Sequence, residues 1–258
     1  MSRDAAPELL DFRPQVALAS LSGEADAEWA RASSEYAGAA VLGGVALDEA
    51  TREAARELVA RDRSEFLPAD PVAFVDEQLA ALSDTPLQAG FNVRTTELPP
   101  LGSVAAVCHD RDAFVEINAH CRQEEMCAAG VGETLLRSPD RLRAQVDTAA
   151  ETGATVSVKV RAEVDGVDLP ALAERIEAAG ADAVHVDAMD TESVVGDVSA
   201  ATDLFVIANN EVRDRASVRE YLNYGADAVS VGRPSNEPAV LERVSDATTA
   251  WFAEGVES

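Results

Sequence analysis

Lysine is nearly missing from this sequence: Lys159 is the only one, and the other 20 of the 21 basic residues are arginines. Acidic residues number 47, which leaves a formal net charge of −26. Such a charge repels nucleic-acid phosphates at long range, and no run of basic residues offers a local exception. Abundant acids with almost no lysine are typical of salt-loving archaea, where molar salt screens repulsion. We therefore predict a halophilic protein with a solvated acidic surface.

Long apolar runs and a cysteine framework are missing as well. No stretch approaches the roughly 20 apolar residues that a membrane-spanning helix needs, so we predict no membrane contact. Residues 1–12 carry acids where a signal peptide would be apolar, so we expect no targeting segment. The three cysteines cannot form a disulfide framework and suit a reducing compartment. We therefore predict a cytoplasmic protein, and the sequence leaves its oligomeric state open.

Short β-branched runs alternate with amphipathic, acid-rich segments along the whole chain, which is 47% hydrophobic. Several of the helical patterns end at a glycine that leads into the next strand, as Gly153, Gly180 and Gly225 do. The expected strands are residues 16–20, 39–45, 87–93, 114–119, 155–160, 183–187, 204–209 and 228–232. The clearest helical patterns cover residues 139–152, 169–179, 217–224 and 237–253.

Eight strand–helix units predict a single closed (β/α)8 TIM barrel, an α/β fold spanning residues 1–258. Residues 47–83 are expected to form two helices inserted between the second and third strands. A doubly wound open sheet is the alternative, but no G-x-G-x-x-G turn follows the first strand. No C-x-x-C or H-x-x-x-H spacing indicates a metal, and no G-x-S-x-G indicates a serine nucleophile. We therefore predict no metal site.

Polar residues gather at the predicted C-terminal ends of the strands, where a barrel of this kind forms its active site. Lys159 is the most informative, because it lies near the end of the apolar strand VSVKVR and its ammonium would be partly buried. A buried ammonium needs an anionic or carbonyl partner, either a ligand such as a flavin or a neighbouring acid. The strand-end residues are Ser20, Asn92, Arg94, Asn118, Cys121, Lys159, Arg161, Asp187, Asn209, Asn210, Gly232 and Arg233.

Two of these groups suggest specific chemistry. Asn209 follows the seventh predicted strand and the Gly232–Arg233 pair follows the eighth, where backbone N–H groups and an arginine commonly hold a phosphate. Cys121 precedes a flexible Gly-x-Gly, so its thiol could act as nucleophile or proton donor. The alternatives are a helix-capping glycine with a solvated arginine, and a cysteine that is only a small buried apolar side chain.

Three blocks of sequence resemble the tRNA-dihydrouridine synthases, FMN-dependent barrels related to dihydroorotate and dihydropyrimidine dehydrogenases. EINAHCRQEEMCAAGVGETLLRSPDRL is similar to the family's stretch around its cysteine, with the Gly-x-Gly at the family's spacing. TVSVKVR resembles the strand that carries the family's flavin-contacting lysine. LFVIANNEVRDRASVREYLNYGADAVSVGRPS resembles the family's phosphate-binding block.

This resemblance implies FMN as cofactor, NAD(P)H as electron donor, and a pyrimidine-containing substrate, tRNA in the family. It implies that hydride passes from reduced FMN to C6 of a uracil ring while Cys121 donates a proton to C5. By the same resemblance Asn118, Arg161 and Asp187 would contact the substrate. The expected flavin contacts are Ser20, Asn92 and Lys159, and the expected phosphate contacts are Asn209, Gly232 and Arg233.

The sequence departs from the family's pattern at several of these positions. His120 and Arg122 flank Cys121 where the family has glycine and proline, and Asp187 stands where the family has histidine. The sequence stops at Ser258, so we expect a short form without the family's C-terminal tRNA-binding helical domain. Two alternatives follow: a dehydrogenase of the dihydroorotate or dihydropyrimidine type acting on a free small molecule, and a non-catalytic barrel that binds phosphate or flavin.

Overall fold

Eight parallel strands close into a barrel in the computed structural model, which describes residues 10–256. Residues 1–9, part of the stretch for which no targeting segment is expected, lie outside the described residues. Pairing of β1 with β8 closes the ring, with Leu18 beside Val231. The strands are β1 (Val16–Leu18), β2 (Ala39–Ala46), β3 (Gln88–Arg94), β4 (Phe114–Asn118), β5 (Thr155–Arg161), β6 (Ala183–Asp187), β7 (Phe205–Asn209) and β8 (Ala228–Val231). The predicted (β/α)8 fold is confirmed.

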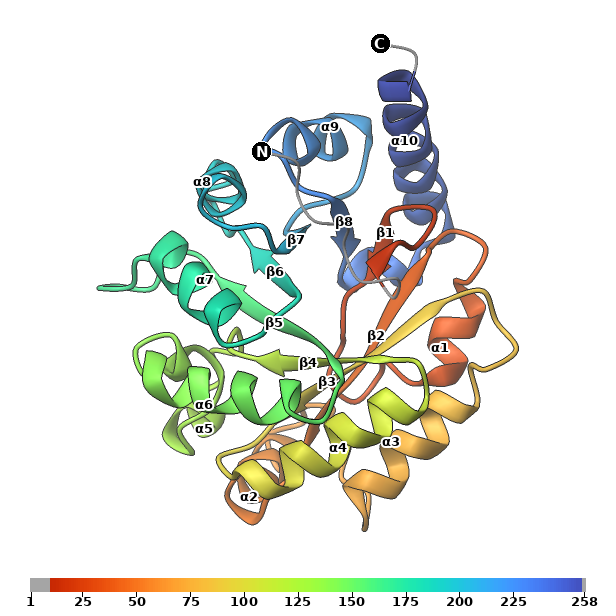
Figure 1. Cartoon of the computed structure of the whole chain (residues 1–258). Helices are drawn as coiled ribbons and strands as arrows, with labels where there is room; N and C mark the ends of the chain where they lie inside the picture. The colour runs from red at the N-terminus through yellow and green to blue at the C-terminus, as the bar shows by residue number, and fades with distance from the viewer. Residues whose placement is uncertain (1–9, 257–258) are drawn as a thin grey trace.

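The helices form a ring outside the strands, as Figure 1 shows in a view along the barrel. Two of them, α2 and α3, stand between β2 and β3, and their first turns are capped by the side chains of Asp48 and Asp70. The helices are α1 (Ala27–Ala32), α2 (Glu49–Val59), α3 (Pro71–Ala80), α4 (Leu98–Asp110), α5 (Glu124–Ala128), α6 (Pro139–Ala150), α7 (Leu169–Ala178), α8 (Val194–Ala201), α9 (Arg215–Asn223) and α10 (Pro238–Val256). Two short 3₁₀ helices matter for the site, η2 (Gly132–Leu135) and η3 (Arg233–Asn236). Within residues 10–256, no helix combines the length and apolarity needed to cross a bilayer.

Valines on the outer face of the strands bury the barrel against its helices. Val156 and Val158 of β5 are fully buried in one cluster with Leu142 of α6 and Ile176 of α7. Burying each such side chain contributes about 1.5–3 kcal/mol. Because successive side chains of a strand point to opposite faces, the residues between these valines must point into the barrel.

The inside of the barrel is apolar at its base and polar toward its mouth. At the base, Ala17, Ala39, Ile207 and Ala228 pack with Phe12 as a small apolar cluster. Above it lies a layer of polar side chains, each at most 1% exposed: Asn92, Glu116, Ser157, His185 and Ser230. The next inward residues along the strands reach the C-terminal mouth. The alternation in TVSVKVR thus separates an outer core from an inner site.

Candidate active site

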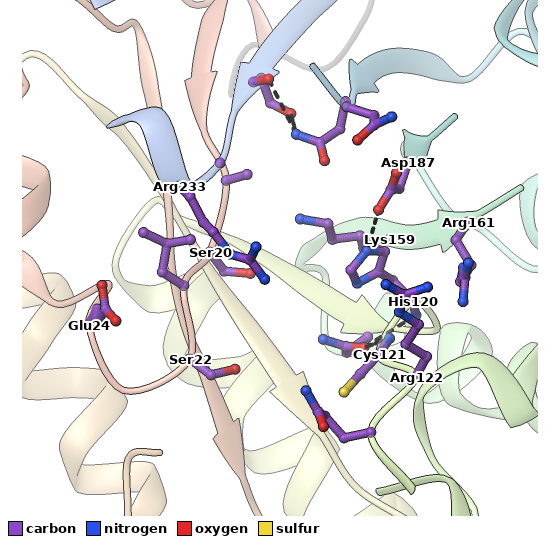
Figure 2. A pocket seen from close by; sticks show the side chains of 18 of the residues that line it. Ser20, Ser22, Glu24, His120, Cys121, Arg122, Lys159, Arg161, Asp187 and Arg233 are labelled. Carbon is purple, nitrogen blue, oxygen red and sulfur yellow. Dashed lines mark hydrogen bonds and ion pairs between the residues drawn. The ribbon is translucent and has the colours of Figure 1, made fainter. Parts of the chain in front are cut away.

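A pocket of about 1100 Å³ opens at the C-terminal ends of the strands. Among residues 10–256 no group of three His, Cys, Asp or Glu side chains could hold a metal ion. Of the ten predicted site residues, all but Asn92 line the pocket: Ser20, Asn118, Cys121, Lys159, Arg161, Asp187, Asn209, Gly232 and Arg233. Figure 2 shows Ser20 and Arg233 on one side of the pocket. Lys159 and Cys121 lie on the opposite side.

Asn92 is buried beneath the pocket and does not line it, whereas the family resemblance predicts that it contacts a flavin. Its side chain is fully buried, donates to Glu116 Oε1 at 2.7 Å and accepts from Asn118 Nδ2 at 2.9 Å. The reason is its height in the barrel: Asn92 pairs in register with Glu116, one layer below the mouth, whereas Arg94 two residues later reaches the pocket. Asn92 therefore supports Asn118 from beneath.

Glu116 and His185 form the centre of this buried polar layer. Glu116 Oε2 lies 2.7 Å from His185 Nδ1, and His185 Nε2 lies 2.7 Å from the hydroxyl of Ser230. Burial would raise the pKa of Glu116, but the His185 ring, the Lys159 ammonium and the Asn92 amide outweigh it and lower the pKa to about 2. Burial lowers the pKa of His185, so the ring is neutral and donates its Nδ1 proton to the carboxylate.

The sequence reasoning missed this layer. The available signal was the placement of Glu116 and His185 inside FVEIN and AVHVD, where an ionisable residue interrupts an otherwise apolar strand at an inward position. In the barrel they stabilise one another across β4, β6 and β8 and form the floor on which the pocket residues stand.

Lys159, two residues after Ser157 on β5, lines the pocket above this polar layer and is only 4% exposed. Burial lowers the pKa of its ammonium, and the nearby carboxylates of Glu116 and Asp187 offset the effect only in part. The ammonium makes no hydrogen bond or ion pair with any residue that the structure describes. A buried cation with unused donors is costly. It therefore points to a partner that is not part of this chain's described residues.

His120 and Asp187 form a hydrogen-bonded pair beside Lys159, with His120 Nε2 2.5 Å from Asp187 Oδ2 (Figure 2). Burial would raise the pKa of Asp187, but the bond to His120 outweighs it and lowers the pKa. Burial also lowers the pKa of His120. The ionised carboxylate therefore accepts the Nε2 proton, which leaves Nδ1 as the hydrogen-bond acceptor of the neutral ring.

The half-buried Cys121 is held by hydrogen bonds on both sides of its peptide. Asn118 Oδ1 accepts from the Cys121 N–H at 2.9 Å, and the Cys121 carbonyl accepts from the Glu133 N–H at 2.8 Å. Gly132 makes this approach possible, because its φ is +65° and a Cβ there would lie 2.1 Å from the Cys121 carbonyl oxygen. The Gly-x-Gly that the sequence singled out thus positions the thiol.

Two buried guanidinium groups of the pocket are committed to carboxylates. Arg161 donates to Glu133 at 2.7 Å, which ties the end of β5 to η2. Arg94 donates to Glu65 at 2.7 Å. Both arginines therefore line the pocket with their charge already compensated.

On the opposite side, Gly232 opens onto free space. A Cβ added to Gly232 would meet no atom within 4 Å, so the backbone can be approached closely from the pocket. Arg233 is exposed and begins η3, where the Ser235 Oγ is buried without a hydrogen-bond partner among the described residues. A donor-rich turn of this kind suits a phosphate.

Asn209, a predicted phosphate contact, lines the pocket, but its amide N–H groups already have partners. Its amide donates to the Ser230 hydroxyl at 2.7 Å and to the Ser230 carbonyl at 3.2 Å, so these N–H groups join β7 to β8. The following Asn210 adopts a φ of +107°, a conformation that favours glycine. Its side chain holds the turn by donating to the Met189 carbonyl at 2.5 Å. The loop thus adopts at Asn210 a positive-φ backbone conformation that is usually occupied by glycine.

Comparison with known proteins identifies relatives of this chain. The family model described as "Dihydrouridine synthase (Dus)" matches residues 99–255, more than half of the chain. An uncharacterised protein of Methanocaldococcus jannaschii is 25% identical over 88% of this chain and 91% of its own length. A probable tRNA-dihydrouridine synthase of Rhodobacter capsulatus is 26% identical over 87% of this chain and 68% of its own length.

Solved structures share the barrel. The M276A mutant of FabK from Thermotoga maritima superposes with a TM-score of 0.59 at 19% identity, covering 88% of this chain, which spans 64% of the FabK chain. A tryptophan synthase complex from Pyrococcus furiosus gives a TM-score of 0.58 at 13% identity, covering 93% of this chain and 99% of that one. At such identities the likeness concerns the fold alone.

Proposed function

This chain belongs to the dihydrouridine synthase family, and from that membership we propose that it is an FMN-dependent oxidoreductase that reduces the C5–C6 double bond of a uracil ring, with a uridine of tRNA as substrate. The observation that carries the proposal is Lys159, a buried ammonium with no partner in the described part of the chain. An electron-rich flavin ring offers the hydrogen-bond acceptors and negative charge that this ammonium lacks.

The residues fit FMN at both ends of the pocket. Lys159 would meet the flavin ring, while Gly232 and Arg233 would hold the phosphate, with the buried Ser235 hydroxyl behind them. The open face of Gly232 supports this assignment, because an added Cβ would project into the pocket where the phosphate must approach. The volume of about 1100 Å³ leaves room for cofactor and base together.

When bound, FMN supplies the hydride chemistry, with NAD(P)H as the source of electrons. The chain's own contribution begins at Cys121, whose thiol would donate its proton to C5 as C6 receives hydride. The double bond thereby becomes a single bond, and the thiolate takes a new proton from solvent. Cys121 is suited to this role because Asn118 and the η2 turn hold its peptide at the pocket wall.

Asn118 is the proposed donor to a ring carbonyl of the substrate. One of its two amide N–H groups is used on Asn92, and the other remains for a ligand. Its carbonyl oxygen is committed to the Cys121 N–H, so orientation of the thiol and of the base would be coupled through one side chain. Arg161 and Asp187 complete the proposed substrate wall.

The test combines a flavin readout with a product readout, in molar KCl. The variant Cys121→Ala should bind FMN as the wild type does, seen by its absorbance bands, but form dihydrouridine at least about 100-fold more slowly. Cys108→Ala is the control, because this thiol lies on α4 and does not line the pocket. A wild-type protein that takes up no FMN, or a Cys121→Ala variant with full activity, would refute the proposal. Reduction of free uracil but not of tRNA would instead assign a dehydrogenase of the small-molecule type.

A further inference from the structure

The charge of the pocket is opposite to that of the chain. Seven of the 21 basic residues line this one pocket, together with only five of the 47 acidic ones. The fold therefore gathers a third of the positive charge at the mouth of the barrel, although no run of basic residues exists in the sequence. A concave site with a net positive charge favours anionic ligands.

Most of these cations already have a partner or an assignment. Arg94 and Arg161 are paired with carboxylates, and Arg213 pairs with Glu211 at 2.7 Å. Lys159 and Arg233 are assigned to the cofactor by the proposed function. Two arginines of the pocket then remain unexplained, Arg63 and Arg122, which are both exposed.

Arg63 and Arg122 share two properties. Neither side chain makes a hydrogen bond or ion pair within residues 10–256. They also lie on neighbouring segments: Arg63 follows α2 and Arg122 precedes α5, and Arg61, just after α2, forms an ion pair with Glu125 of α5. Buried side chains of α2 and α5 share one apolar cluster. Both unpaired guanidinium groups therefore line the pocket that also contains Cys121.

We propose that Arg63 and Arg122 bind backbone phosphates beside the target uridine of the RNA substrate. This inference rests on the proposed function and adds the substrate-positioning residues to it. A guanidinium matches the fork of phosphate oxygens and can bind two of them at once. A free pyrimidine has no phosphate and would leave both arginines unused.

The acidic surface does not oppose this assignment in the salt for which the composition is suited. At about 1 M salt the screening length falls to roughly 3 Å, so distant carboxylates no longer repel the backbone. Direct contacts between an arginine and a phosphate still form under those conditions, although each one weakens as the salt concentration rises.

The experiment measures RNA binding directly, so that it does not depend on catalysis. An unmodified tRNA transcript with a fluorescent 5′ end is titrated with wild type and with the double variant Arg63→Gln/Arg122→Gln, and its anisotropy is followed over a range of KCl concentrations. The control is Arg243→Gln, because Arg243 is exposed on α10, is also unpaired in the described structure and lies outside the pocket lining. FMN affinity is measured for each protein.

We expect the double variant to bind the transcript at least about tenfold more weakly, and its salt slope to fall by roughly 1.4, the value for two phosphates of a single strand. FMN affinity should stay unchanged in every variant. The inference would be overturned if the double variant bound the transcript within twofold of the Arg243→Gln control. It would also be overturned if the wild type bound no transcript, or if inorganic polyphosphate displaced the transcript from the wild type and the double variant equally well. Failure of the proposed function has a separate signature, since it is seen in the wild-type FMN titration alone.

Discussion

Substituting Lys159 by methionine should weaken cofactor binding without destabilising the fold. Methionine keeps much of the length of the lysine stem and removes the charge. In the protein without FMN the charged form of Lys159 is disfavoured, because burial lowers its pKa below the ordinary 10.5 despite the carboxylates nearby. Removing the charge should therefore leave the melting temperature unchanged or raise it.

With FMN bound, the same substitution should be costly. A hydrogen bond from a charged donor contributes about 1.5–3 kcal/mol, so its loss should weaken FMN binding roughly 10- to 150-fold. Quenching of flavin fluorescence on titration measures the affinity, and thermal melts without FMN measure the stability. FMN affinity and melting temperature together distinguish a lysine that binds the cofactor from one that stabilises the fold.

The pH dependence gives the sign of the stability effect independently. Because the folded pKa of Lys159 lies below the unfolded value, the folded state binds fewer protons between the two. Wild-type stability should therefore rise with pH in that window; the penalty is full below the folded pKa and vanishes above about 10.5. Lys159→Met should lose this rise. A variant that keeps FMN affinity but loses about 3–5 kcal/mol of stability, as when a buried ion pair is broken, would refute the reasoning.

Two further substitutions test the floor and the wall of the pocket. Glu116→Gln should cost about 1.5–3 kcal/mol in urea titrations near neutral pH, because Asn92 and His185 lose the charged acceptor to which both donate. The contribution of the ionised Glu116 to the stability of the fold is fully present above its ordinary pKa of 4.5 and is lost as the pH falls toward about 2. The variant should therefore lack this decline in stability at acid pH. Equal stability of the two proteins at neutral pH contradicts the prediction. Gly132→Ala should displace the Cys121 carbonyl, 2.1 Å from the new Cβ, and slow uracil reduction about a hundredfold with FMN affinity kept. Gly102→Ala inside α4 meets only an ordinary contact, so this control should keep its activity and gain about 0.5–1 kcal/mol in thermal melts; an active Gly132→Ala variant would contradict the role of the turn.

Local patterns predicted the fold and one wall of the site because their physical causes are local. In β5 a valine alternates with a polar residue, and a strand must place the two kinds of side chain on opposite faces. The same alternation that buries Val158 against the helices turns Lys159 into the barrel. The positive φ of Gly132 likewise follows from a turn that the Gly-x-Gly spacing already indicated.

Other site assignments depended on how the strands are staggered. Asn92 and Asn118 both end predicted strands, yet only Asn118 reaches the pocket, because the register of β3 on β4 puts Asn92 beside Glu116. Pairing of His185 with Glu116 and Ser230 joins strands that are not neighbours in the barrel. A stagger set by closure of the whole ring has no signature in any single segment.

The sequence by itself determined the strand–helix alternation, the inward or outward direction of each strand residue and the cysteine turn, since each follows from the backbone geometry of a few adjacent residues. Only the tertiary structure decided which polar residues share a layer and where the charge collects. Packing of α2 on α5 brings Arg63 and Arg122, distant in sequence, to the lining of one pocket. The chain as a whole is strongly acidic, but the pocket at the barrel mouth carries a net positive charge, because folding brings together basic residues that are far apart in the sequence.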